Sequence, residues 1–264
     1  MAKRDARKSV LAIAAHPDDI EFVMSGTMMR LIELGWEAHY FNLANGCCGS
    51  MTLGREECAR TRLDEAKNAA AALPAQFYAP ICDDMEVIYA TSLLKQVASV
   101  IRQAAPSVLL THATQDYMED HQNAARLAVS GAFVRGIPNF VCEPTADCYF
   151  EDVAIYHAQP HGNRDPLGTV VRPELCVDVT DLLERKRQLL EMHRSQSSWL
   201  GESQGMDSYV ATMEELNTEV GMMSGVFRRA EGWRQHLRIG FSRPGFDPLA
   251  EALGEAAIRL SEPK

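Results

Sequence analysis

The sequence lacks any uncharged apolar run near the ~18 residues that a membrane-spanning helix requires, so no such span is expected. Its basic amino terminus precedes an apolar segment, Val10 to Ala15, that is too short for the hydrophobic region of a secretory signal. These absences argue against a helical integral membrane protein and against secretion. They predict a cytoplasmic location.

Positive charge is also scarce. The 26 Lys and Arg residues are outnumbered by 36 Asp and Glu residues, which gives a formal net charge of −10. Affinity for phosphate groups is built from clustered Lys and Arg, so binding to nucleic acid or to an anionic membrane is not expected. The predicted partner is a small-molecule substrate, and the sequence leaves open whether copies associate into a homo-oligomer.

The cysteines lack the pattern of a disulfide framework or a zinc finger. There are seven, an odd number, and no Cys-x-x-Cys spacing occurs. The glycine-containing loop at 45–54 likewise lacks the Gly-x-Gly-x-x-Gly and Gly-Lys-Ser/Thr arrangements of nucleotide sites. We therefore predict free thiols in a reducing compartment, and a loop that forms a wall of the active site.

No Gly/Ser/Pro-rich linker divides the 264 residues, so we predict one domain over residues 1–264, with less regular segments from about residue 137. In the first half, short β-rich runs alternate with helical patterns, which indicates an α/β fold with βαβ units around a mostly parallel sheet. Expected strands cover residues 9–15, 37–43, 76–78, 107–111 and 153–157. Expected helices cover residues 20–34, 55–73, 91–105, 182–193, 206–223 and 248–260.

Ligand-type side chains follow the first expected strand directly, in the string His16-Pro17-Asp18-Asp19. The carboxyl edge of a parallel sheet is where open α/β folds bind ligands. Imidazole and carboxylate are ligands of catalytic Zn²⁺, and two adjacent carboxylates allow one to bind metal while the other moves protons. The alternative is that Asp18 or Asp19 only caps the following helix and that His16 lies in a turn.

A second cluster, Thr111 to His121, follows a later expected strand and should reach the same sheet edge. Two strand ends that carry His and Asp favour a shared metal site, with His121 as the distant ligand. The alternatives are a helix cap or a solvated surface residue for His121, and a buried histidine bonded to backbone for His112. Asp120 is predicted either to orient an imidazole or to cap a helix.

These residues resemble a known family. The strand that ends in Ala-His-Pro-Asp-Asp is similar to the opening of the PIG-L/LmbE-like zinc-dependent de-N-acetylases, and the Thr-His-x-x-x-Asp-x-x-x-Asp-His pattern at 111–121 is similar to their second motif. Looser similarities extend the resemblance over most of residues 9–200; they lie at Asn45-Gly46, Arg62, Glu65, Lys186 and 193–196.

The resemblance implies a three-layer, Rossmann-like fold in which His16, Asp19 and His121 hold zinc and Asp18 is the general base. A bound Zn²⁺, or Fe²⁺ on the same ligands, would lower the pKa of its water and polarise an amide carbonyl. The implied activity is hydrolysis of the acetyl group of an N-acetylated amino sugar or a related amide. Five further residues are weaker candidates for contact with the substrate: Asn45, Arg62, Asp84, His112 and His193.

One position departs from the family pattern. Many members have a histidine three residues before the last metal ligand, where it stabilises the oxyanion or protonates the amine, whereas this chain has Met118. A thioether is unsuited to either task. Either Asp18 returns its own proton, or another histidine takes the role. The candidates are His112, His157, His161 and His193.

Two other functions stay open at this point. The scaffold also supports metal-dependent hydration of an unsaturated acid, and Met118 motivates that alternative. The third possibility is a non-catalytic α/β ligand-binding module in which the His and Asp residues are caps; it would keep its metal content unchanged after His121→Ala.

Overall fold

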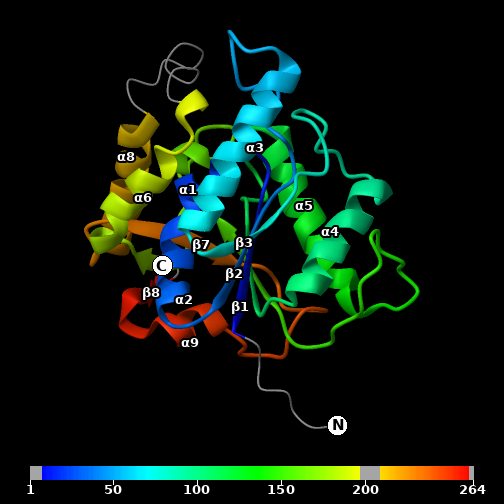
Figure 1. Cartoon of the computed structure of the whole chain (residues 1–264). Coiled ribbons are helices and arrows are strands. Elements are labelled where there is room, and N and C mark those ends of the chain that lie inside the picture. Colours follow the sequence, from blue (N-terminus) through cyan, green and yellow to red (C-terminus); the bar gives the residue numbers. More distant parts are fainter. Residues whose placement is uncertain (1–7, 197–208, 262–264) are drawn as a thin grey trace.

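The computed structural model describes residues 8–196 and 209–261, and these form a sheet with helices on both faces (Figure 1). The strands lie in the order β3-β2-β1-β4-β5-β7-β6-β8. The first five of these are parallel, and β7, β6 and β8 continue the sheet in antiparallel fashion. The strand bounds are β1 (Ser9–Ala14), β2 (Glu37–Asn42), β3 (Ala75–Tyr78), β4 (Val108–Thr111), β5 (Ala154–Ala158), β6 (Leu175–Asp178), β7 (Ala230–Gln235) and β8 (Ala257–Arg259).

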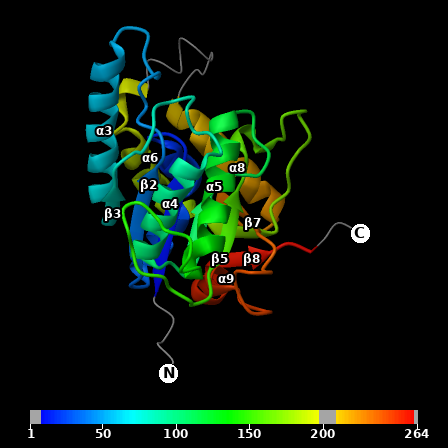
Figure 2. The same cartoon turned by 90° about the vertical axis from the view of Figure 1, so that its right-hand side faces the viewer.

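Two layers of helices cover the sheet, as the two perpendicular views show (Figures 1 and 2). One face carries α4 (Thr91–Ala104) and α5 (Glu119–Phe133). The other carries α1 (Asp19–Val23), α2 (Ser25–Glu33), α3 (Arg55–Ala72), α6 (Leu183–Leu190), α8 (Tyr209–Ser224) and α9 (Pro248–Leu253). The predicted α/β fold, a mostly parallel sheet flanked by helices, is confirmed. In the described residues, no helix combines the length and apolarity needed to cross a membrane.

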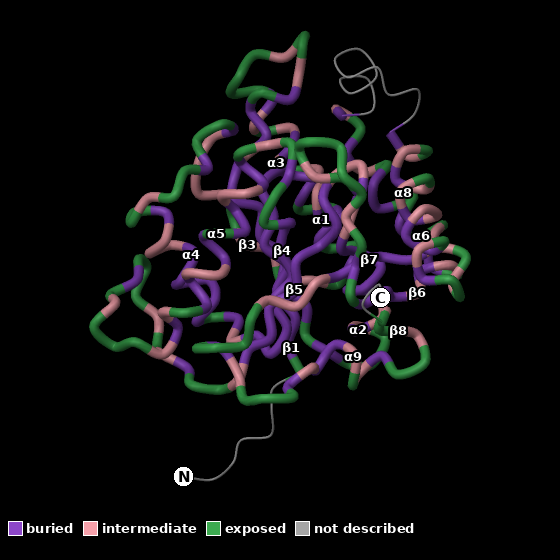
Figure 3. The backbone as a smooth tube through the Cα atoms, turned by 180° about the vertical axis from the view of Figure 1, so that it is seen from behind, coloured by how far each residue is buried: buried purple, intermediate pink, exposed green. Residues whose placement is uncertain are grey.

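Strand β1 lies at the centre of this arrangement, and all six of its residues are buried. Val10, Ala12 and Ala14 pack into the core beneath α2, whereas Leu11 and Ile13 pack toward α4 and α5. A strand buried on both faces is a nearly continuous apolar run, which is why this segment could be recognised from the sequence. Figure 3 shows the strands as a buried centre surrounded by exposed loops.

The sheet topology brings distant segments together at one edge. Strand β1 pairs with β2 on one side and with β4 on the other, and Ile13 is in register with Thr111. The loop after β1 and the loop after β4 therefore leave the sheet side by side. The chain thus continues from β1 to β2 on one side and returns to β4 on the other. Where the connections diverge in this way, a crevice opens at the carboxyl ends of the strands, and ligands bind there in folds of this kind.

Several expected helices have different bounds in the structure. The helix expected over 20–34 is interrupted at Met24, whose φ of −130° separates α1 from α2. The helix expected over 248–260 was predicted too long: it ends at Leu253, because Gly254 has a φ of 53°, and β8 follows. Of the helix expected over 206–223, residues 206–208 lie outside the described residues and α8 covers the rest.

Candidate active site

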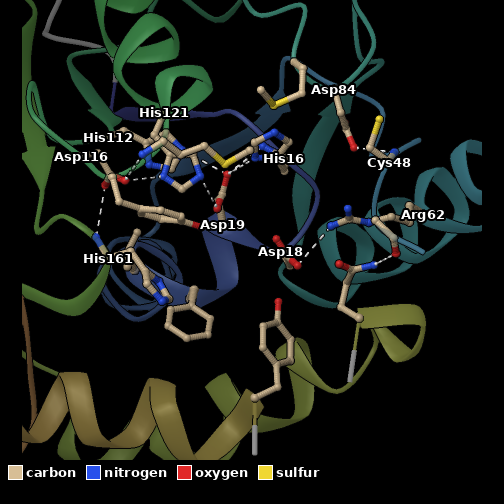
Figure 4. A pocket seen from close by; sticks show the side chains of 18 of the residues that line it. His16, Asp18, Asp19, Cys48, Arg62, Asp84, His112, Asp116, His121 and His161 are labelled. Carbon is tan, nitrogen blue, oxygen red and sulfur yellow. Dashed lines mark hydrogen bonds and ion pairs between the residues drawn. The ribbon is translucent and has the colours of Figure 1, made fainter. Parts of the chain in front are cut away.

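A cavity of about 280 Å³ opens at the carboxyl edge of the parallel strands. Both predicted clusters reach it: His16, Asp18 and Asp19 from the loop after β1 and the start of α1, and His112 and His121 from the loop after β4 and the start of α5. In Figure 4 the imidazoles of His16, His112 and His121 lie around the carboxylate of Asp19, while Asp18 lies apart from them, next to Arg62. The two motifs therefore share one pocket.

His16 is held by a carboxylate on each side of its ring. Its Nε2 lies 3.0 Å from Oδ2 of Asp120, and its Nδ1 lies 3.5 Å from Oδ2 of Asp19, which also accepts a 2.7 Å hydrogen bond from the His16 backbone N–H. Burial alone would lower the pKa of His16, but its hydrogen bonds to the carboxylates of Asp120 and Asp19 raise it to about 10. The Asp120 contact leaves Nδ1 as the nitrogen that points to Asp19.

His121 has a matching arrangement with its nitrogens exchanged. Nδ1 donates to Oδ1 of Asp116 at 3.0 Å, and Nε2 lies 3.4 Å from Oδ1 of Asp19. Burial lowers the pKa of His121, but the charges of Asp19 and Asp116 raise it above its usual value. A carboxylate behind each imidazole is the usual arrangement for metal-ligating histidines, since it fixes the tautomer and orients the ring.

His16, Asp19 and His121 offer ligand atoms that all lie within 4.8 Å of one another. Burial opposes ionisation of Asp19, yet His121 and His112 hold its pKa well below the usual range, so the carboxylate is charged. Two imidazole nitrogens and a carboxylate that face one point are the donor set of a catalytic zinc site. The residues present therefore fit a divalent metal ion.

His112 belongs to an overlapping group with Asp116 and His121 that also meets this distance criterion. Its ring stacks on His121 with the centroids 4.2 Å apart, and its Nε2 accepts a 3.0 Å hydrogen bond from the backbone N–H of Ala15. The N–H of Ala15 thus occupies the lone pair of Nε2, and Asp116 is engaged by His121. The group of His16, Asp19 and His121 is therefore the better metal site. His112 packs beside it, against the ring of His121.

Asp18 occupies an unusual backbone position next to this group. It precedes α1 with a φ of 103°, a left-handed conformation that costs an ordinary side chain roughly 1–3 kcal/mol. Its Oδ2 lies 3.1 Å from Nη2 of Arg62. Burial raises the pKa of Asp18, and the charge of Arg62 opposes the increase. The result is a proton-accepting carboxylate beside the metal-ligand group but outside it.

Arg62 and Asp84, both expected to face the substrate, line the cavity and also shape its wall. Arg62 is only 4% exposed, and its side chain packs so closely against Gly46 and Gly49 that a Cβ atom at either glycine would lie within 2.5 Å of it. Asp84 accepts hydrogen bonds from the backbone N–H groups of Gly46 at 2.7 Å and Cys48 at 2.8 Å. The glycine-containing loop is therefore a pocket wall.

The structure places Asn45 and His193 away from the cavity. Asn45 accepts a hydrogen bond from the backbone N–H of Cys47 and donates to Asp83, so its amide groups are used within the loop. His193 is fully buried, with Nε2 3.4 Å from Oε2 of Glu21. Neither side chain lines this cavity, so neither is placed to contact a ligand in it directly.

Sequence reasoning assigned no role to Asp116, and it left open whether His161 or His157 replaces the family histidine at Met118. Asp116 is 1% exposed and binds His121, and its place in the second motif was the signal that could have identified it. His161 lines the cavity together with Met118, and its ring lies 5.2 Å from that of Phe22 and 5.5 Å from that of Tyr117. His157 instead lies between the backbone carbonyl of His112 and the ring of His236.

Residues 11–132 match the model of the PIG-L family, GlcNAc-PI de-N-acetylase, and this range contains all three candidate metal ligands. Residues 11–132 of the chain therefore resemble the PIG-L family. Over 199 residues it is 27% identical to the diacetylchitobiose deacetylase of Thermococcus kodakarensis, an alignment that covers 72% of this chain and 70% of that protein. The resemblance to this family that the two motifs predicted is confirmed.

Solved structures agree with this resemblance. The chain is similar to N,N'-diacetylchitobiose deacetylase from Pyrococcus horikoshii in complex with an inhibitor, with a TM-score of 0.73, 25% identity, and coverage of 92% of this chain and 88% of that one. It also shares its fold with the 4-carboxy-2-hydroxymuconate hydratase of Pseudomonas putida, with a TM-score of 0.70, 20% identity, and coverage of 91% and 99%.

Proposed function

We propose that this protein is a metal-dependent hydrolase that removes the acetyl group from an N-acetylated amino sugar or a related amide. The observation that carries the proposal is the convergence of His16, Asp19 and His121 beside the buried carboxylate of Asp18, inside one cavity. The similarity to a diacetylchitobiose deacetylase at 27% identity supports the reaction class.

His16 would hold the metal ion through Nδ1, Asp19 through its carboxylate, and His121 through Nε2. Zn²⁺ suits this donor set, and Fe²⁺ is the main alternative. When bound there, a divalent ion supplies Lewis-acid chemistry that activates water and polarises an amide carbonyl. Asp116 and Asp120 keep each imidazole in the tautomer that presents a lone pair to the ion.

Asp18 would move the protons of the reaction. Its burial favours the protonated form more than water would, which suits a group that first accepts a proton from the attacking water and then returns it to the departing amine. The guanidinium of Arg62 keeps the carboxylate in place through its 3.1 Å contact. Its backbone conformation likewise fixes the direction in which the Asp18 side chain leaves the chain.

The walls of the cavity fit a small ligand with both polar and apolar faces. Phe22, Tyr117 and Tyr209 contribute aromatic surface, and Gln159 and Gln196 contribute amide groups. At about 280 Å³ the cavity lies near the lower end of the ~300–1,000 Å³ typical of small-molecule sites. We therefore expect one N-acetylated sugar unit to enter the cavity, with any further unit outside it.

Met118 leaves the oxyanion without the histidine that many family members have. Of the four histidines that sequence reasoning offered as replacements, His112 and His161 line the cavity. Because Nε2 of His112 is engaged by Ala15, we assign the role to His161, whose ring lies among Phe22 and Tyr117 in the cavity wall. Asp18 then returns the proton to the amine.

The test is acetate release from a panel of N-acetylated glycosides by protein loaded with one divalent metal at a time. We expect activity in the wild type, and a rate roughly 100-fold lower in Asp18→Asn, with metal content unchanged, because only the base is removed. Asp64→Asn, on the exposed face of α3, serves as the matched control and should keep full activity. A metal-loaded wild type that releases no acetate from any substrate contradicts the proposal.

Hydration of an unsaturated acid is the second candidate, and Met118 is the observation that favours it. A hydratase adds water across a carbon–carbon double bond and releases no acetate. The same preparation, assayed against unsaturated dicarboxylic acids by loss of their conjugated absorbance, separates the two functions. If the protein consumes an unsaturated dicarboxylic acid and releases no acetate from any N-acetylated glycoside, the function of this site is hydration and not deacetylation.

A further inference from the structure

Two adjacent cysteines occupy the tip of the tight turn that forms one wall of the cavity. Gly46 and Gly49 close this turn, with the backbone N–H of Gly49 donating to the carbonyl of Gly46 at 3.1 Å, so Cys47 and Cys48 are its two central residues. The carboxylate of Asp84 lies against the turn and binds the N–H groups of Gly46 and Cys48. The turn and Asp84 thus form one hydrogen-bonded unit.

The sulfur atoms are spaced as metal ligands would be. Sγ of Cys47 lies 3.8 Å from Sγ of Cys48. Two thiolates bound tetrahedrally to Zn²⁺ at ~2.3 Å lie about 3.8 Å apart, so both could bind one ion without a change in their separation. A carboxylate oxygen of Asp84 lies within 4.8 Å of both sulfur atoms, and it retains lone pairs beyond those used by the two N–H groups.

The turn is fixed in this shape by its neighbours. Gly46 has a φ of 79°, and Arg62 packs where side chains would otherwise project from Gly46 and Gly49. The side chain of Asn45 accepts the N–H of Cys47 at 3.0 Å. A ligand pair that is already held together loses little conformational freedom on binding an ion, which favours binding over a mobile pair of thiols.

We infer that Cys47, Cys48 and Asp84 form a second metal site that takes a thiophilic divalent ion such as Zn²⁺ or Cd²⁺. The soft sulfur ligands distinguish it from the site of His16, Asp19 and His121, which has nitrogen and oxygen donors. Cys47 and Asp84 are buried, but Cys48 is exposed, which gives an ion a route to the pair.

The position of this second site gives it a consequence for catalysis, which rests on the proposed function. Cys48 and Asp84 line the same cavity as Asp18, on the side of Arg62 and across from His112 and Asp116 (Figure 4). An ion there adds volume and positive charge to the wall of a small cavity. Excess Zn²⁺ therefore inhibits the enzyme by narrowing the space that the substrate needs.

The site is tested with Cd²⁺ alone, because thiolate-to-cadmium charge transfer absorbs in the ultraviolet and needs no enzymatic activity. Full-length protein in a non-thiol reductant should develop this absorbance up to one equivalent of thiolate-bound Cd²⁺. His121→Ala should keep it, since the other site has no sulfur ligand. Cys47→Ser/Cys48→Ser should lose it, and Cys148→Ser, which removes a partly exposed thiol elsewhere, should keep it.

Cys48→Ser alone provides a second variant, because an exposed side chain is easily replaced without loss of folding. It should weaken Cd²⁺ binding, while circular dichroism reports an unchanged fold. Charge-transfer absorbance that persists in the double variant, or that disappears equally in Cys148→Ser, would overturn the site.

The inhibitory consequence has a separate readout. Each protein loaded with one equivalent of metal is compared with itself after addition of excess Zn²⁺, and we expect the wild type to lose activity and the double cysteine variant to lose far less. Equal inhibition of both proteins would overturn this consequence. If no protein releases acetate while the Cd²⁺ titration behaves as described, the proposed function fails and the second metal site stands.

Discussion

At the scale of single residues, the carboxylates behind the two imidazoles matter as much as the ligands. Asp116 binds Nδ1 of His121 and Asp120 binds Nε2 of His16, each at 3.0 Å. We predict that Asp116→Asn and Asp120→Asn each weaken binding of Zn²⁺ roughly 10–100-fold, because an amide orients an imidazole less firmly than a carboxylate. Competition with a chelator measures the change. Glu56→Gln, on an exposed side chain of α3, should leave the affinity at the wild-type value.

His161 is the side chain assigned to the oxyanion, and its neutral state is part of that assignment. Burial and the nearby charge of His121 lower its pKa, so at neutral pH it is an uncharged N–H donor. We predict that His161→Phe, which keeps a ring against Phe22 and Tyr117, lowers kcat roughly 100–1,000-fold without loss of metal. Steady-state kinetics and metal analysis test this. An unchanged kcat would assign the oxyanion to another group.

The sequence allowed the meeting of the two His/Asp clusters to be predicted, because each follows the end of a recognisable parallel strand. The choice of His16, Asp19 and His121 within these clusters came from the family resemblance. Which other residues contact the cavity depends on the directions of single side chains, and no sequence motif specifies these. Asn45 lies in a strand-end loop as expected, yet the chain turns so that its side chain binds Cys47 and Asp83. His193 faces Glu21 in the interior, because it lies in a segment that packs beneath α1.

At the scale of secondary structure, one buried ion pair joins three elements. Lys186 of α6 binds Glu231 of β7, and both side chains are nearly inaccessible to solvent. Glu231 also accepts the N–H groups of Gly26 at 2.9 Å and Thr27 at 2.7 Å, which cap the start of α2. A carboxylate at the amino terminus of a helix satisfies its free donors and interacts favourably with its dipole.

We predict that Lys186→Met lowers the free energy of unfolding by about 3–5 kcal/mol, because Glu231 is left as a buried charge without its cation. Denaturation by urea measures the loss. The double variant Lys186→Met/Glu231→Gln should recover part of the stability. Arg187→Met, next to it on the exposed face of α6, should cost less than about 1 kcal/mol. Equal losses for Lys186→Met and Arg187→Met would contradict the prediction.

The same pair explains why β7 escaped prediction. Strand β1 is a nearly continuous apolar run and β2 carries Ala38, Tyr40 and Phe41, so their bounds could be read to within one residue. Strand β7 contains Glu231, Gly232 and Arg234, a composition that is atypical of a buried strand. Its carboxylate is tolerated only because Lys186 and the start of α2 neutralise it. That compensation comes from residues about 45 and 205 positions away, beyond the reach of any local pattern.

At the scale of the whole molecule, stability should depend on pH through a buried histidine where the parallel and antiparallel parts of the sheet meet. His157 of β5 donates from Nδ1 to the carbonyl of His112 at 2.8 Å, and its Nε2 lies 3.0 Å from Nδ1 of His236. Burial lowers the pKa of His157 to about 4, and the carbonyl of His112 only partly opposes this effect. The folded protein therefore keeps this ring neutral when the unfolded chain has already taken up a proton.

Stability should then fall as the pH decreases from about 6.5 toward 4, the interval between the unfolded and folded pKa values of His157. We predict that between pH 7 and pH 5 the wild type loses about 2 kcal/mol more free energy of unfolding than His157→Gln, whose amide can still donate to the carbonyl of His112. Urea titrations at the two pH values measure this difference. Parallel losses in both proteins would assign the acid sensitivity elsewhere.

The pocket draws on two stretches of chain with different duties. Residues 11–132, the part that matches the family model, contain His16, Asp18, Asp19 and His121. Gln159, His161, Gln196 and Tyr209, which also line the cavity, all come later. The proposed metal ligands and Asp18 thus lie in the first stretch, whereas the second contributes His161 and part of the surface around the substrate. A chimera that takes its later half from a relative with a histidine equivalent to His161 should perform the same reaction on a different compound, because substrate preference can then change while the metal ligands stay the same.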